Sequence, residues 1–160
     1  MRKLILVGVI CLAHTLLGQS NSTSIIFSDG LYFTNNTQTT LYSGDYQEYY
    51  ESGALRLDMS IKEGKPEGAY VVYFESGKPH EVRAYRNGLL HGLWRTYNEM
   101  GTLVAEASYV RNLKQGVWRI WDDAGVLRCQ MQYENGKKSG IWYMWNEHGQ
   151  LISEKNYSSK

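Results

Sequence analysis

The chain repeats one pattern five times at a period of 24 residues, and this repeat restricts the possible folds more than any other feature. Position one of each copy is a glycine: Gly44, Gly68, Gly92, Gly116 and Gly140. Position eight is acidic: Glu51, Glu75, Glu99, Asp123 and Glu147. Position ten is a second glycine: Gly53, Gly77, Gly101, Gly125 and Gly149. Columns this regular identify an internal repeat from residue 44 onward.

Aromatic residues fill three further columns of the repeat. Position three holds Tyr46, Tyr70, Trp94, Trp118 and Trp142. Position six holds Tyr49, Tyr73, Tyr97, Trp121 and Trp145. Position eighteen holds Ile61, Tyr85, Tyr109, Tyr133 and Tyr157. A unit of this length cannot bury its own aromatic face, so neighbouring units are expected to cover it.

Each unit contains two runs with strand character. The first, such as residues 117–121, is aromatic and β-branched, and it ends at the acid-x-Gly turn. The second, such as residues 127–133, alternates apolar and polar side chains with the period of two typical of a half-buried strand. The sequence therefore predicts an all-β fold, an antiparallel β-meander of 24-residue hairpin repeats in one elongated, twisted single sheet. Ten strands at ~4.8 Å spacing would extend about 50 Å.

The regions before the repeats have different characters. Arg2 and Lys3 precede an apolar run that ends at Leu17, and a small residue follows at Gly18. This pattern predicts a signal peptide over residues 1–19, with an uncleaved anchor as the alternative. Residues 20–43 are predicted to form a hairpin that caps the open first edge of the sheet, and residues 44–160 the five repeats, the last one truncated. The expected location is exported: periplasm, cell envelope or extracellular.

Charge and cysteine content exclude several partners and stabilising devices. The net charge is +1, and removal of Arg2 and Lys3 leaves 17 − 2 = 15 basic against 16 acidic residues. Without a basic surface we expect no nucleic-acid partner, and any membrane contact would not use a basic patch. Cys11 lies within the predicted signal peptide, so Cys129 would be the one cysteine left, without an internal disulfide. It is interpreted as a small buried residue rather than a reactive thiol.

No group of residues predicts catalysis, a metal site or a cofactor. His80, His91 and His148 occupy different unit positions near turns, and no two have a spacing that would build a metal site. The position-eight acids would lie ~10 Å apart along one edge, too far to share a calcium ion. They are interpreted as polar residues that hydrogen-bond their own turns, with a carboxylate ladder as the alternative.

Two tryptophan-rich columns are the candidate binding strip. Because positions three and six are an odd number apart, their side chains should point to opposite faces. The first column contains Trp94, Trp118 and Trp142, and the second contains Tyr97, Trp121 and Trp145. Either column could bind a partner, or it could be structural, with the stems of Arg95, Arg119 and Lys155 covering the rings.

The pattern NG-x-x-x-G-x-W-x-x-Y/W-x-E/D-x-G-x-L, together with "DGLYF" from Asp29, resembles the MORN-repeat variant of bacterial YwqK-family antitoxins. The resemblance covers about Asp29 to Tyr157 and implies the same repeat fold. It also implies an antitoxin or immunity role that neutralises a partner toxin. The predicted export signal departs from what an antitoxin acting in its own cytoplasm would need.

The predicted function is therefore a non-enzymatic, exported module that binds or scaffolds another protein at the cell envelope. The resemblance supplies the antitoxin role as one alternative, and binding of a glycan or lipid surface through an aromatic strip is another. The strand expected over residues 152–157 has no later strand to cover it, so end-to-end pairing of two copies is a further hypothesis.

Overall fold

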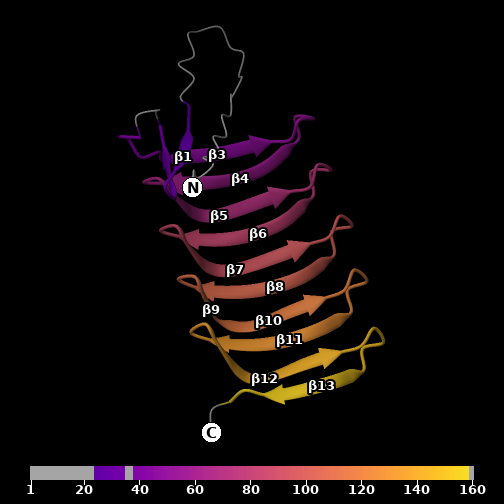
Figure 1. The fold of residues 1–160 in the computed structure, drawn as a ribbon. Helices are drawn as coiled ribbons and strands as arrows, with labels where there is room; N and C mark the ends of the chain where they lie inside the picture. The colour runs from indigo at the N-terminus through magenta and orange to yellow at the C-terminus, as the bar shows by residue number, and fades with distance from the viewer. Residues whose placement is uncertain (1–23, 35–37, 159–160) are drawn as a thin grey trace, which may run out of the picture.

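A computed structural model of the chain describes residues 24–34 and 38–158. The predicted signal peptide lies outside the described residues. The described part is all-β (Figure 1), and none of its segments is a helix long and apolar enough to cross a bilayer. The strands are β1 (Ile26–Ser28), β2 (Leu31–Phe33), β3 (Gly44–Tyr49), β4 (Leu55–Lys62), β5 (Lys65–Tyr73), β6 (Pro79–Arg86), β7 (Leu89–Tyr97), β8 (Leu103–Val110), β9 (Leu113–Lys114), β10 (Gly116–Trp121), β11 (Leu127–Glu134), β12 (Lys137–Trp145) and β13 (Leu151–Asn156).

The repeats form one open antiparallel sheet, which confirms the predicted fold class. Its order is β13-β12-β11-β10-β8-β7-β6-β5-β4-β3, so each strand pairs with its neighbours in sequence. The short β9 pairs with β8 and is separated from β10 only at Gln115. Figure 1 shows the strands stacked in chain order, with the turns along two opposite margins. This simple order follows because short turns allow only adjacent antiparallel pairing.

The acid-x-Gly turns are closed by the residue before the acid. In the third repeat, the side-chain oxygen of Asn98 accepts hydrogen bonds from the backbone N–H groups of Met100 (3.1 Å) and Thr102 (2.9 Å). Gly101 takes a left-handed φ of 90° and donates its N–H to the Asn98 carbonyl at 2.9 Å. The interpretation that the position-eight acid closes its own turn is therefore wrong in this repeat, because Glu99 points out of the turn and is exposed.

Position seven differs between the first two and the last three repeats. Asp122 and Asn146 repeat the hydrogen bonds of Asn98, and the bond from the Val126 N–H is the main cause that lowers the pKa of Asp122. The first two repeats carry Tyr50 and Phe74 at this position instead. Their turns keep the same backbone bonds but replace the side-chain acceptor with an aromatic ring.

The cluster of buried core residues lies at the N-terminal end of the sheet, and Tyr133 of β11, 8% exposed, is buried apart from it. Tyr46, Leu57, Met59 and Ile61 are 8%, 6%, 3% and 3% exposed. Ile25, Tyr32 and Tyr42, which precede the repeats, pack against this cluster. The core therefore depends on residues outside the repeat, as expected for a single-layer sheet whose units cannot cover themselves.

The hairpin of β1 and β2 turns at Asp29–Gly30 and covers a face of the sheet instead of extending its edge. It forms a separate two-stranded sheet, and no strand in the described chain pairs with the outer side of β3. The Tyr32 N–H donates to the Gly64 carbonyl at 2.9 Å in the β4–β5 turn, and its ring lies 5.1 Å from that of Tyr46. The expectation that residues 20–43 would cap the first edge is thus corrected. Apolar burial against Tyr46 favours the face, because an edge position would leave Tyr32 exposed.

Candidate functional site

The position-three tryptophans belong to one continuous stack of rings. Tyrosines at position eighteen of the neighbouring strands lie between them. The ring centroids are 5.8 Å apart for Trp94–Tyr109, 5.1 Å for Tyr109–Trp118, 5.0 Å for Trp118–Tyr133, 5.2 Å for Tyr133–Trp142 and 4.7 Å for Trp142–Tyr157. We call these six residues the aromatic ladder, and the side of the sheet that carries them the ladder face. These spacings lie in the range in which aromatic pairs stabilise a fold beyond simple burial.

The intervening tyrosines were not predicted as part of a site. Their column is visible in the sequence, but which tryptophan each one meets depends on strand register. Trp118 pairs across the sheet with Met131, so the Tyr133 two residues farther along points to the same face and reaches the Trp118 ring. A period-two argument across paired strands could have found this contact.

Cations lie over the ladder rings. The Lys114 Nζ atom is 4.4 Å from the Trp118 centroid and 4.8 Å from that of Tyr133. The Lys138 Nζ atom is 4.5 Å from the Trp142 centroid and 4.9 Å from that of Tyr157. These distances are within the range of cation–π attraction.

The cations that the sequence suggested for covering the rings lie on both faces of the sheet. Lys155 lies near the ladder, with its Nζ atom 5.2 Å from the Tyr157 centroid. Arg95 and Arg119 lie away from the ladder tryptophans. Each follows its tryptophan directly, so it points to the other face, where Glu106 binds Arg95 at 2.9 Å and Arg119 at 3.5 Å.

The second aromatic column, Tyr97, Trp121 and Trp145, lies on that opposite face. Tyr143, next to Trp142, contacts Trp145 with ring centroids 5.7 Å apart. The ion pairs of Glu106 separate this column from the middle of the face. The two columns of the candidate strip therefore have different surroundings, an uninterrupted stack on one face and a charged row beside aromatic residues on the other.

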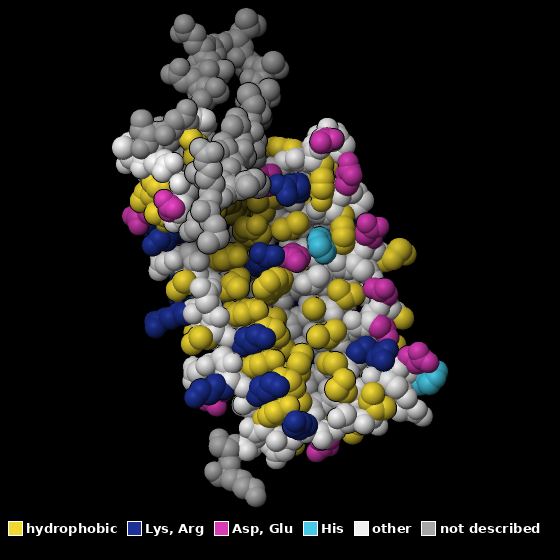
Figure 2. Space-filling view, viewed as in Figure 1, with side chains coloured by type: hydrophobic (Ala, Val, Ile, Leu, Met, Phe, Trp, Pro, Cys, Tyr) yellow, Lys and Arg dark blue, Asp and Glu magenta, His cyan; other side chains and the backbone are white. Residues whose placement is uncertain are grey.

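A segment from outside the repeats covers the ladder face at one end. Farther along, Tyr133 is also buried, at 8% exposed, between the rings of Trp118 and Trp142. At β3 and β4 the hairpin residues bury the ladder face, whereas Trp94, Trp118 and Trp142 are half-buried. Beside them Ile120 is 42% exposed and Met144 is 48% exposed. In Figure 2 the hydrophobic side chains form a band down this face, with Lys and Arg side chains among them.

The indole N–H groups of the ladder are not equivalent. Trp118 Nε1 donates to the Ser108 carbonyl at 3.1 Å, and Trp142 Nε1 donates to the Gln132 carbonyl at 3.0 Å. Trp94 Nε1 is buried and has no acceptor in the described structure. The ring planes of Trp94 and Tyr109 are inclined by 31°, whereas the Trp118 ring is inclined by 58° to Tyr109 and by 53° to Tyr133.

A hollow of about 200 Å³ opens on the ladder face between Trp94 and Trp118. Its floor contains Ala105 and Ala107 of β8, and Ile120 lines one side. Two alanines on the same face of one strand leave room that larger side chains fill elsewhere. The position of Ala107 is taken by Met59 in β4 and Met131 in β11.

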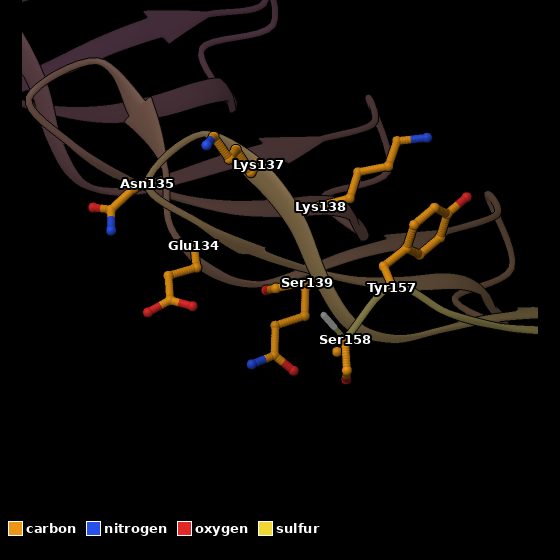
Figure 3. Close-up of a pocket in the computed structure, with 9 residues that line it drawn as sticks. Glu134, Asn135, Lys137, Lys138, Ser139, Tyr157 and Ser158 are labelled. Atoms are coloured by element: carbon orange, nitrogen blue, oxygen red, sulfur yellow. The ribbon is translucent and has the colours of Figure 1, made fainter. Parts of the chain in front are cut away.

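A second, more polar hollow of about 560 Å³ lies at the C-terminal end, beside the β11–β12 turn. Figure 3 shows Lys138 and Tyr157 on one side of β12, and Glu134 and Asn135 on the other. The Oγ atom of Ser139 in this hollow is buried without a hydrogen-bond partner in the described structure. Lys138 lies over the Trp142 ring and also lines this hollow, so the hollow adjoins the C-terminal end of the ladder.

Ionisation does not alter the ladder rings near neutral pH. Burial raises the pKa of Tyr109 and of Tyr133 above the ordinary value of a tyrosine. Both rings are therefore neutral there, and the positive charge near the ladder comes from Arg83, whose guanidinium carbon lies 4.3 Å from the Trp94 centroid, and from Lys114, Lys138 and Lys155.

Within residues 24–34 and 38–158, no three histidine, cysteine or acidic side chains form a group that could hold a metal ion. The rings of His80 and Phe74 are in contact, with centroids 4.4 Å apart. The Nε2 atom of His148 lies 3.6 Å from the Oε1 atom of its neighbour Glu147. The position-eight acids are all exposed at turns, and Figure 2 shows acidic side chains along that margin. Cys129 is half-buried as a free thiol.

The comparisons with known proteins concern the later repeats. No curated protein matches the chain. MORN repeats are non-catalytic modules that generally bind proteins or membranes, and the comparisons add nothing in favour of the antitoxin assignment. Three consecutive segments, residues 90–111, 114–135 and 138–159, match the model described as the MORN repeat variant.

Proposed function

We propose that the protein is an exported, non-enzymatic module that binds another protein through the open part of its ladder face. The observation that carries the proposal is the unequal cover of this face. The chain buries the face at β3 and β4 under its own hairpin, but leaves half-buried tryptophans and an apolar hollow from β7 onward. Exposed aromatic surface next to a hollow is the usual composition of a binding surface in which a few anchors supply most of the affinity.

Export is supported by the charged start, short apolar run and small residue of the first 19 positions. The match to MORN repeats, which are non-catalytic modules that generally bind proteins or membranes, supports a binding role. The opposite face is the less favourable surface because Glu106 already pairs with Arg95 and Arg119 there.

Site-specific photocrosslinking in cells that produce the protein tests the proposal. A photoreactive benzoylphenylalanine replaces Ile120 on the ladder face or, as the matched control, Leu93 on the opposite face. Both side chains are similarly exposed, at 42% and 44%. We expect one protein to be crosslinked from position 120 and not from position 93, and the mass of the product to show a mature N-terminus near residue 20.

Equal crosslinking from both positions, or none from position 120, would contradict binding through the ladder face. A product that retains residues 1–19 and is found only inside the cell would contradict export. These two results are independent, so the binding surface and the location are tested separately.

A further inference from the structure

The lysines on the ladder face have no acidic partner. Lys114, Lys138 and Lys155 contact aromatic rings, and in the part of the chain that the structure describes none of them forms an ion pair. Several arginines are treated differently: Arg56, Arg83, Arg95, Arg119 and Arg128 each pair with a carboxylate. Lys62, Lys65, Lys78, Arg86, Arg111 and Lys137 likewise form no ion pair among the described residues. What distinguishes Lys114, Lys138 and Lys155 is that their unpaired charge lies over the aromatic ladder.

Two of the three lysines follow the ladder at the interval of the repeat, and Lys155 lies beside Tyr157 at the C-terminal end of the ladder. Lys114 and Lys138 are 24 residues apart and occupy the same position in successive units. Equivalent positions lie two strands apart, so the spacing along the ladder is about 10 Å. A peptide in the polyproline II conformation rises ~3.1 Å per residue with three residues per turn, so it would present every third side chain to the ladder at an interval of about 9 Å.

This charge is confined to the later repeats. The position of Lys114 and Lys138 is occupied by Tyr42, Pro66 and Leu90 in the earlier units. Tyr42 there belongs to the chain's own cover and packs on the buried core. The position is aromatic or apolar at Tyr42, Pro66 and Leu90, and it becomes cationic in the next two units at Lys114 and Lys138.

The apolar hollow lies on the same stretch of the face. Trp94 and Trp118 form its walls, and Trp118 carries Lys114 over its ring. The hollow therefore offers a place for one apolar side chain beside the row of cations. A lipid headgroup layer could use the lysines but has no single side chain to insert between the two tryptophans.

We infer that the partner, given the protein-binding function proposed above, presents an acidic segment with an apolar anchor. The anchor fills the hollow between Trp94 and Trp118, and the carboxylates of the segment lie against Lys114, Lys138 and Lys155. Charge complementarity sets the register of the segment on the ladder, and the anchor supplies buried apolar area.

Binding of synthetic peptides to the full mature chain tests this inference. The first peptide has glutamate at every third position and a central leucine; the second replaces the glutamates with glutamine, and the third replaces the leucine with serine. Phosphatidylcholine vesicles containing phosphatidylserine provide the lipid probe. The protein variants are Lys114→Gln/Lys138→Gln/Lys155→Gln, the equal-charge control Lys62→Gln/Lys65→Gln/Lys78→Gln, and Ala107→Met.

We expect the glutamate–leucine peptide to bind the parent and the control variant, with affinity that falls as salt is added. Loss of three exposed charge pairs should weaken binding to the ladder-lysine variant about tenfold. Ala107→Met should keep the fold, because methionine occupies this position in β4 and β11. The added methionine side chain should fill the hollow, so this variant should bind the leucine peptide more weakly than the parent does and bind the serine peptide with unchanged affinity.

Equal binding of the glutamine peptide would overturn the acidic partner while leaving protein binding at this face intact. Lysine-dependent binding of vesicles without binding of peptides would assign the face to anionic lipid and overturn the inference. If no probe binds but position 120 still crosslinks to one protein, the inference fails and the proposed function stands. If the crosslink is absent as well, both fail.

Discussion

The two halves of the ladder face are built from the same repeat but end in different environments. Around β3 and β4, Leu57 and Met59 are 6% and 3% exposed because the N-terminal hairpin lies over them. At the other end every residue of β13 is exposed, including Ile152 at 60%. The comparison teaches that a repeat fixes which side chains share a face, whereas burial depends on what lies over that face.

The two edges of the sheet differ as well. At β3 the Tyr42 hydroxyl donates a hydrogen bond to the Asp45 carbonyl at 2.6 Å. A Cβ added to Gly44 would meet the same hydroxyl at 2.7 Å. The outer side of β13 has no paired strand in the described chain, and Lys155 is a charge of the kind that discourages pairing there. Pairing of two copies through β13 stays a prediction.

Truncation of equivalent methionines should give the largest difference between the halves. Met59→Ala removes a side chain from the buried cluster and should lower the free energy of unfolding by about 2–5 kcal/mol. Met131→Ala at the same unit position should cost about 1 kcal/mol, because Met131 is half-exposed and water can occupy the space. Urea unfolding followed by tryptophan fluorescence measures both. Equal costs would show that the hairpin does not make the N-terminal half a distinct core.

Alkaline pH should weaken the covered half in particular. Burial raises the pKa of Tyr32 from 10.0 to about 12. The unfolded chain releases this proton near pH 10 and the folded chain only near pH 12, so the stability is complete below pH 10 and declines between these values. The loss should be on the order of 1.5 kcal/mol after allowance for solvent screening.

Thermal unfolding at pH 8 and pH 11 measures this effect in the parent and in Tyr32→Phe. The variant keeps the ring and lacks the titrating hydroxyl, so its melting temperature should fall less between the two pH values. An identical fall in both proteins would mean that Tyr32 is not responsible.

The smallest expected effect concerns the turns of the later repeats. Asn98→Ala removes the acceptor for the N–H groups of Met100 and Thr102 and should cost about 1 kcal/mol. Asn98→Asp should be tolerated, because Asp122 makes the equivalent bonds in the next repeat. Urea unfolding of the two variants decides the matter. If Asp is as costly as Ala, the side-chain acceptor does not close this turn.

Local pattern was sufficient to predict the strands and their order. The period-two runs, the glycines with left-handed φ and the short turns all act within one hairpin, and neighbouring hairpins pair in sequence order. Side-chain roles that depend on a few ångströms were harder to predict. Turn closure was assigned to Glu99, although Asn98 makes the bonds, because a one-residue shift in the turn exchanges the inward and outward side chains.

The candidate site was predicted in part. Trp94, Trp118 and Trp142 do share a face, but the tyrosines between them come from neighbouring strands. Which ring each lysine covers depends on the path of the backbone between Lys114 and Trp118 and between Lys138 and Trp142. The hollow at Ala105 and Ala107 was missed, because two alanines in a strand read as ordinary alternation until both neighbouring tryptophans are placed.

By itself, the sequence determined the meander, because every contact that defines it joins residues close together in the chain. Only the tertiary structure decided which part of the ladder face is covered. The hairpin reaches that face through the bond from Tyr32 to Gly64, and apolar burial against Tyr46 and Met59 holds it there. No periodicity encodes such a contact, because the covering segment lies outside the repeat.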